Sequence, residues 1–171
     1  SDDMIGMVEL SLPGEFADGW TDNARLAKGK LYQLKDLESR VDPKVVARKR
    51  QMIASRSSAD RQKVRALLKG LDKEAPSFDK DNLYGAIFLE MSFEPGQGKT
   101  RRPASAGRLQ VTEISCKEIL PTSTADMSTT YCEFWIANQP KNKLKTGVCK
   151  KTLDPKWYEE PEKPWEFMVT E

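Results

Sequence analysis

Residues near the start of the chain alternate between apolar and polar positions. In residues 4–12, Val8, Leu10 and Leu12 fall on one face of an extended segment, which is the pattern of a half-buried β-strand. Residues 30–34 are short and apolar enough for a second strand. We therefore predict two strands before residue 36, joined by a segment rich in Pro, Gly and Asp.

The same period returns after residue 83, in short segments separated by turn residues. They predict a mainly β, antiparallel sandwich. The predicted strands are 83–93, 108–114, 131–137, 143–151 and 164–169. The residues expected to face inward are Ile87, Leu89, Met91, Phe93, Cys132, Phe134, Ile136, Leu144, Thr146, Val148, Trp165, Phe167 and Val169. Those expected to face outward are Lys143, Lys145 and Cys149.

Between these regions the period becomes that of helices. Asp42 followed by Pro43 is a favourable helix start, because Asp caps a helix and Pro suits its first turn. A second helix is predicted after Ser57, whose spacing to Asp60 is close to a capping box. The apolar stripe of this second helix consists of Val64, Leu67, Leu68 and Leu71.

The predicted helices carry most of the excess positive charge. The net charge of the chain is only +2, but residues 37–78 contain eleven Lys or Arg against five Asp or Glu. We expect these cations on the outer faces of the helices. Two interpretations stay open, a solvated helical linker and a docking site for an acidic partner or membrane. The candidate patch comprises Arg48, Lys49, Arg50, Arg61, Lys63 and Arg65.

The composition argues against catalysis. The chain contains no histidine, which removes Ser-His and Cys-His nucleophile pairs and the commonest zinc ligand. Cys116, Cys132 and Cys149 are widely spaced, as expected for reduced thiols of a cytoplasmic protein. No apolar run is long enough to cross a bilayer, and a chain that begins with Ser1 is expected to be part of a longer protein. We expect no enzyme activity, no cofactor and no nucleic-acid binding, since the basic helices lack interleaved aromatic residues.

The C-terminal half resembles the first five strands of a C2 domain. The segment GRLQVTEISCKEILP is followed by a Tyr-containing strand and then by the lysine-rich TGVCKKTLDPKW, and this order and spacing are similar to those of the family. The N-terminal SDDMIGMVELSL resembles the segment that enters the seventh strand of the family. Residues 30–34 resemble its eighth strand.

The resemblance implies a tandem arrangement. Residues 1–36 would close one C2-like domain, residues 37–82 would be a basic helical linker, and residues 83–171 would open a second C2-like domain. Neither sandwich would be complete, and exposed sheet edges are unfavourable. One solution is that the remaining segments of a larger protein complete both domains. The other is a single circularly permuted sandwich, in which N-terminal strands pair with C-terminal ones and the sixth strand is missing.

C2 domains often bind calcium through loop aspartates, and the ion then bridges to anionic lipid. In the first loop only Asp126 is present, and Thr129 and Thr130 stand where the family has a second aspartate and a proline. Because calcium needs several oxygen ligands, the resemblance implies calcium-independent docking by the second domain. Asp3 is the corresponding candidate ligand of the preceding domain, for which calcium binding stays open.

The lysine-rich fourth strand fits the family better. In the family this basic face binds phosphoinositides, acidic lipid or acidic protein partners. Each lysine near an anionic surface contributes about 1 kcal/mol. The resemblance thus implies a non-catalytic docking module for an anionic phospholipid membrane or an acidic protein surface. The candidate binding residues are Lys141, Lys143, Lys145, Lys150 and Lys151.

Two alternatives to lipid docking stay open. The chain could be a structural scaffold on a filament or microtubule, without lipid binding, or its lysines could only protect an exposed strand from pairing. Trp157 and Trp165 are expected to pack in the core rather than insert into a membrane. Cys149, which has lysine neighbours, is a candidate reactive thiol.

Overall fold

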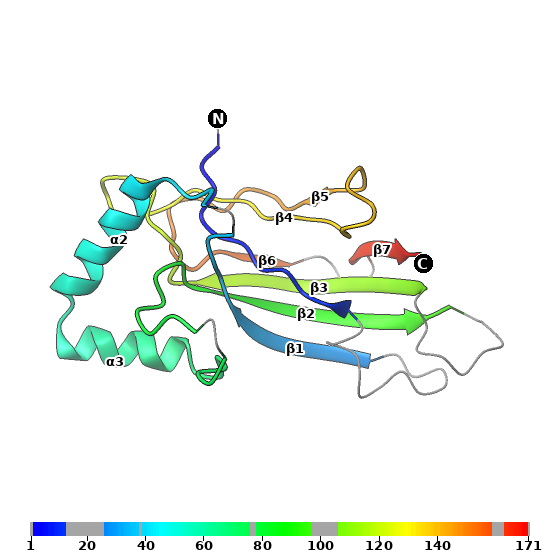
Figure 1. Ribbon diagram of the computed structural model, residues 1–171, viewed down its shortest axis with the longest axis horizontal. Helices are drawn as coiled ribbons and strands as arrows, with labels where there is room; N and C mark the ends of the chain where they lie inside the picture. Colours follow the sequence, from blue (N-terminus) through cyan, green and yellow to red (C-terminus); the bar gives the residue numbers. More distant parts are fainter. Residues whose placement is uncertain are drawn as a thin grey trace.

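Nine helices and strands are defined in the described part of the chain. The computed structural model describes residues 2–12, 26–37, 39–75, 78–96, 106–158 and 163–170. Figure 1 shows both helices at one end of the long strands and the β4–β5 hairpin on the side where the N-terminus emerges. The elements are β1 (Leu26–Gln33), α2 (Pro43–Ser55), α3 (Ser58–Leu67), β2 (Ala86–Pro95), β3 (Gly107–Lys117), β4 (Glu133–Phe134), β5 (Leu144–Lys145), β6 (Lys156–Tyr158) and β7 (Trp165–Val169).

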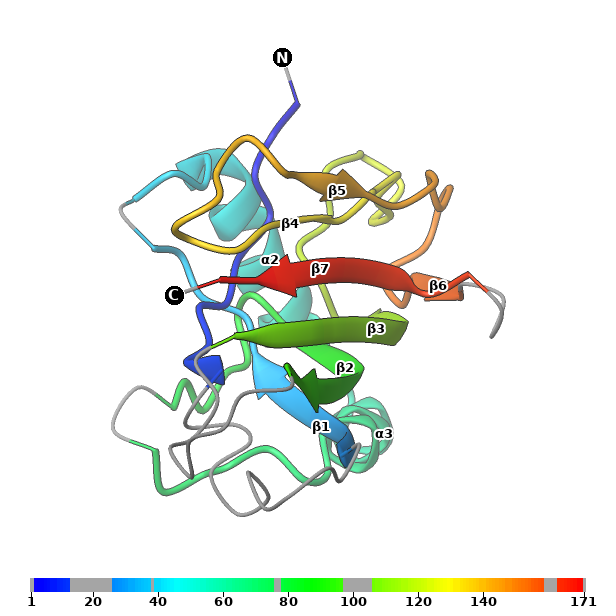
Figure 2. The same cartoon turned by 90° about the vertical axis from the view of Figure 1, so that its right-hand side faces the viewer.

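The main sheet is antiparallel and joins the two ends of the sequence. Its strand order is β1-β2-β3-β6, and β7 also pairs with β3. Figure 2 shows β1, β2, β3 and β7 side by side. All eight residues of β1 pair with β2, from Leu26 opposite Phe93 to Gln33 opposite Ala86. The N-terminal strand therefore pairs with a later one, as in the permuted alternative, while an origin of the two regions in separate C2-like domains stays a prediction.

A β-bulge at Thr112 interrupts the alternation of β3. Between Glu90 and Met91 of β2 the register skips Thr112, whose hydroxyl donates to the Glu90 carboxylate at 2.8 Å. A bulge adds one residue to one strand, so the inward-facing positions change from odd to even numbers. The buried apolar side chains of β3 are accordingly Leu109 and Val111 before the bulge and Ile114 and Cys116 after it, and Ser115 between the last two is buried as well.

Both helices begin at the predicted capping residues. The Asp42 carboxylate accepts a hydrogen bond from the Lys44 N–H, and Pro43 occupies the first turn of α2. The Ser57 hydroxyl accepts a hydrogen bond from the Asp60 N–H and caps α3. These caps satisfy N–H groups that have no partner within a helix. The predicted helix starts are thereby confirmed.

The apolar stripe predicted for α3 is partly buried at Val64 and fully buried only beyond the end of the helix. Leu68 and Leu71 are buried and pack with Ala86 of β2, but Leu67 is exposed. The prediction was wrong for Leu67, because α3 ends at this residue and the chain reaches the sheet through the turn that follows. Neither described helix has the length and apolar character needed to cross a bilayer.

The β4–β5 hairpin packs over the main sheet. The ring of Phe134 in β4 meets Trp165 and Phe167 of β7 edge to face, with ring centroids 5.7 and 5.6 Å apart. Such contacts add about 0.5–1.5 kcal/mol to the burial of the rings. Trp157 is buried in the same cluster. These positions confirm the core placement of Trp157 and Trp165, and the antiparallel sheet confirms the predicted fold class.

The N-terminal segment lies on the core without forming a regular strand. Among the described residues it makes two isolated bridges, Met4 with Val41 and Met7 with Lys35. The prediction of a regular strand over 4–12 was therefore wrong. The alternation still identified Val8, Leu10 and Leu12, which pack on the core; Ile5 packs there too, although it lies outside the predicted face.

Candidate docking surface

The β4–β5 hairpin has one face on the core and one face in solvent. Glu133 lies opposite Lys145, and Phe134 lies opposite Leu144. Successive side chains of a strand point to opposite faces. Phe134 and Leu144 accordingly pack on the core, whereas Glu133 and Lys145 are exposed. The predicted outward direction of Lys143 and Lys145 is confirmed.

Two of these lysines lie over neighbouring aromatic rings. The Lys143 Nζ is 4.4 Å from the centroid of Trp135, and the Lys145 Nζ is 3.6 Å from the centroid of Tyr131. Trp135 is 36% exposed, and both lysines are exposed. A cation over a ring at an exposed site gains about 0.5–1 kcal/mol. The rings therefore orient the two ammonium groups while leaving them accessible to a partner.

Carboxylates offset part of this positive charge. The Tyr131 hydroxyl donates a hydrogen bond to the Asp2 carboxylate, and this bond raises the pKa of Tyr131 to about 12. Glu133 stands directly opposite Lys145 in the hairpin. The hairpin surface is thus a mixture of two aromatic rings, two exposed lysines and two exposed acids.

The other three predicted lysines are exposed around the hairpin. Lys141 lies in the turn between β4 and β5, and Lys150 and Lys151 follow β5. The Lys151 N–H donates to the Thr129 hydroxyl at 3.3 Å, and the Thr152 N–H donates to the Ser128 carbonyl oxygen at 2.9 Å. The loop after β5 is therefore attached to the loop before β4. The binding role of all five lysines stays a prediction.

The alternation predicted after β5 was wrong at two residues. Val148, expected inward, is 56% exposed, and Cys149, expected outward, is half-buried against the core. The inward placement of Leu144 and Thr146 is confirmed. The physical reason is that β5 ends at Lys145, so the two-residue period no longer determines which way the following side chains point.

Lys49 does not lie on the outer face of α2, as was predicted. Its side chain is 0% exposed, and its Nζ donates to the Glu118 carboxylate at 3.0 Å and to the Glu118 carbonyl oxygen at 2.6 Å. Arg56 donates to the same carboxylate. Residues four apart share a helix face, and Lys49 lies one turn after Val45, which packs on Leu120. This face of α2 is therefore buried although it contains a cation.

Burial and pairing act against each other in this cluster. Burial lowers the pKa of Lys49, and the neighbouring Glu118 only partly opposes this shift. Burial alone would raise the pKa of Glu118, but Lys49 and Arg56 outweigh it and hold that pKa below its ordinary value. Glu118 is therefore ionised at neutral pH, and it compensates a charge that would be costly to bury alone.

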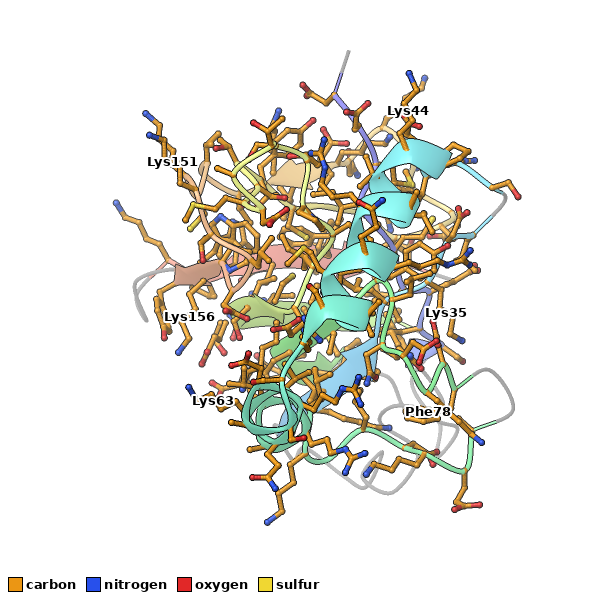
Figure 3. The ribbon with its side chains drawn as sticks, turned by 90° about the vertical axis from the view of Figure 1, so that its left-hand side faces the viewer. Lys35, Lys44, Lys63, Phe78, Lys151 and Lys156 are labelled. Atoms are coloured by element: carbon orange, nitrogen blue, oxygen red, sulfur yellow. The ribbon has the colours of Figure 1, made fainter. Side chains whose placement is uncertain are left out.

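The remaining residues of the predicted helical patch lie nearer the surface. Arg48 is half-buried, and the other four are exposed. Among the ion pairs of the described residues, none involves these side chains. Figure 3 shows the helical end with Lys44, Lys63 and Lys151 labelled. The exposed residues of the patch are Arg50, Arg61, Lys63 and Arg65.

The two calcium candidates, Asp3 and Asp126, are both exposed. Asp126 lies in a turn with φ +55°, and its N–H donates to the Ser123 carbonyl oxygen at 3.2 Å. Within the described ranges, no three His, Cys, Asp or Glu side chains are grouped as metal ligands. Calcium coordination by either aspartate stays a prediction.

Sequence analysis missed Tyr131, Trp135 and Glu118. The first two could have been found, because Cys132, Phe134 and Ile136 were placed inward and alternation then directs their neighbours outward. Glu118 gave no comparable signal, since its role depends on a helix far away in the sequence.

The comparison with protein families matches residues 107–167 to the C2 domain. This segment is less than half of the chain and runs from β3 through the hairpin and β6 into β7. No curated protein and no solved structure matches the chain significantly. Together with the antiparallel sheet, the family match confirms the prediction of a C2-type β-sandwich. It also points to a module that docks on lipid or protein, as C2 domains generally do.

Proposed function

We propose that this chain contains a non-catalytic C2-type docking module that binds anionic phospholipid membranes through the outer face of the hairpin. The observation that carries the proposal is the pairing of Lys143 with Trp135 and of Lys145 with Tyr131 on an exposed face. Lysine provides the charge that attracts acidic headgroups. Tyr and Trp have an apolar body and a polar tip, which suits them to the membrane interface.

The charge balance favours a large anionic surface over a single small anion. The five exposed lysines are distributed over the β4–β5 turn, β5 with the residue before it, and the loop after β5. Glu133 and Asp2 lie among them and would oppose a compact anion at the centre. A membrane surface contacts many separated cations at once, and each contributes about 1 kcal/mol. Binding by this route needs no calcium.

An acidic protein surface, such as that of a filament or microtubule, is the second candidate partner. The observation that favours it is the set of exposed helical cations without ion-pair partners among the described residues, including Arg50 and Lys63. The two functions differ in whether binding requires lipid. A protein partner would be bound equally well in the absence of membranes.

Co-sedimentation with vesicles tests the proposed function. Phosphatidylcholine vesicles with and without phosphatidylserine would be used with and without calcium. We expect binding only to the anionic vesicles, unaffected by calcium and weakened by salt. Lys143→Ala/Lys145→Ala should weaken it roughly 30-fold, because two contributions of about 1 kcal/mol are lost.

The matched control is Lys73→Ala/Lys80→Ala, which removes two exposed charges near α3 and away from the hairpin. It should weaken binding far less than the hairpin variant. Equal effects of both variants would show that only net charge matters. Absence of binding by the unaltered chain would refute membrane docking and favour the protein partner.

A further inference from the structure

We infer that α2 and the loop after β5 form one composite cationic surface for an anionic bilayer, and that the buried Lys49–Glu118 pair positions α2 in it. This inference rests on the proposed docking function. It assigns a positioning role to two residues that do not themselves touch the membrane.

The inner face of α2 is fixed to the sandwich along its length. Val45 packs on Leu120 at one end, Lys49 bonds to Glu118 in the middle, and Arg56 reaches the same carboxylate just after the helix. Four- and seven-residue spacings place these side chains on one helical stripe. A helix of 13 residues is marginal on its own in water, so these contacts determine its position.

Glu118 also connects α2 to the loop that carries two of the exposed lysines. The Glu118 N–H donates to the Asp154 carboxylate at 3.0 Å, and the Ile119 N–H donates to the Leu153 carbonyl oxygen at 3.1 Å. Lys150 and Lys151 immediately precede this segment. Residues 118 and 119 are therefore the shared attachment point of α2 and the loop after β5.

The two elements lie on the hairpin side of the molecule. In Figures 1 and 2, α2 is on the same side of the main sheet as β4 and β5. In Figure 3, which views the helical end, Lys44 of α2 and Lys151 both lie in the upper part, on opposite sides of the view. The cations of α2 are thus attached, through residues 118 and 119, to the loop that carries Lys150 and Lys151, instead of lying on a free linker.

Charge complementarity identifies the occupant as an anionic bilayer. Lys44, Arg50, Lys150 and Lys151 are exposed, and within the described part of the chain no carboxylate forms an ion pair with any of them. These four cations belong to two separate elements, α2 and the loop after β5. A continuous charged surface can therefore contact all four together with the hairpin. A single acidic side chain or small anion could reach only one element.

Vesicle binding by Glu118→Ala tests the positioning role, because the substitution has two effects that change the affinity for vesicles in opposite directions. Removing a carboxylate makes the protein more positive, which by charge alone strengthens binding to phosphatidylserine vesicles. Loss of the Lys49 anchor releases α2 and instead weakens binding. We expect binding roughly fivefold to 30-fold weaker, as for the loss of one or two cations, with a smaller dependence on salt.

Glu133→Ala is the matched control, since it removes a carboxylate from the hairpin surface without touching α2. It should strengthen binding. If folded Glu118→Ala binds as tightly as the unaltered chain or more tightly, the positioning role is overturned. Failure of the unaltered chain to bind would instead overturn the proposed function itself.

A surface variant keeps the inference testable if Glu118→Ala does not fold. Lys44→Ser/Arg50→Ser removes two exposed cations of α2 and should weaken vesicle binding roughly 30-fold in addition to the effect of Lys143→Ala/Lys145→Ala. No effect of the α2 variant would show that α2 does not belong to the docking surface, and would contradict the inference.

Discussion

The hairpin and α2 each contain a lysine that lies next to a glutamate, in opposite environments; among the ion pairs of the described residues, only the lysine of α2 forms one with its glutamate. Lys145 stands opposite Glu133 in solvent, whereas Lys49 is fully buried against Glu118. An exposed pair is screened by water and contributes little to stability. A buried pair must compensate the cost of removing two charges from water, so the loss of either partner is expensive.

This difference separates residues that bind from residues that hold the fold. Exposed lysines can be removed with little effect on stability, and they retain a charge that a partner can use. Lys49 has no charge to offer at the surface, but it determines where α2 lies. Residues of one type in one basic sequence region therefore have different functions according to burial.

The largest expected effect is a loss of folding stability in the Glu118→Ala variant. The substitution leaves the buried Lys49 without its carboxylate, and we expect unfolding to require about 3–5 kcal/mol less free energy. Glu133→Ala at the exposed pair should cost less than about 1 kcal/mol. Urea unfolding followed by circular dichroism measures both values.

Lys49→Met/Glu118→Met sharpens this comparison. Replacement of a buried pair by apolar residues is often neutral or stabilising, so the double variant should be more stable than Glu118→Ala. Equal costs for Glu118→Ala and Glu133→Ala would show that the Lys49 pair is no more important to the fold than the exposed one.

A smaller effect is expected on the pH dependence of stability. The pKa of Glu118 is held below its ordinary value in the folded chain, so the stability that it provides is fully present above the unfolded value of about 4.3. This stability is lost as the pH falls through the lower folded value. Glu118→Gln should therefore show a flatter loss of stability below about pH 5 than the unaltered chain, measured by urea unfolding at several pH values.

Much of the fold could be predicted from the sequence because local rules govern it. The caps Asp42 and Ser57 start helices through their own side chains. Alternation identified the core faces of β2 and β4, since those strands have no extra residue of their own. In β3 the buried positions change phase at a bulge against β2, and the prediction of a strand over 108–114 did not include this bulge.

The candidate site was less accessible to prediction because it depends on distant contacts. Nothing in the sequence distinguishes the buried Lys49 from the exposed Arg50 beside it. That distinction follows from the docking of α2 on residues 118–120. The prediction for Val148 failed for a different reason. The two-residue alternation was extended beyond Lys145, where β5 ends and the alternation no longer applies.

A smaller stability effect is expected from the cation–π contact of the hairpin. Tyr131→Leu removes the ring beneath Lys145 and should lower the free energy of unfolding by about 0.5–1 kcal/mol. Tyr131→Phe keeps the ring and is the matched control. If both variants are equally destabilised in urea unfolding, the contact with the ring contributes nothing measurable.

The smallest effect concerns the hydroxyl of Tyr131, which should ionise at a higher pH than an ordinary tyrosine. Its hydrogen bond to Asp2 raises the pKa to about 12, and this bond is present below the ordinary tyrosine value of about 10 and lost as the pH rises through the folded value. Ultraviolet titration should detect the ionisation of Tyr131 near pH 12. In Asp2→Asn it should titrate nearer the ordinary value, and an unchanged titration would contradict the contact.

Hydrogen exchange of the α2 backbone tests most directly whether this helix is a fixed part of the sandwich. If Lys49 and Glu118 anchor it, amides of residues 44–55 should exchange slowly in the unaltered chain, because an isolated helix of this length would open readily. In Glu118→Ala they should exchange much faster, while β3 remains protected. Fast exchange of α2 already in the unaltered chain would show that it is a solvated linker and would contradict the account.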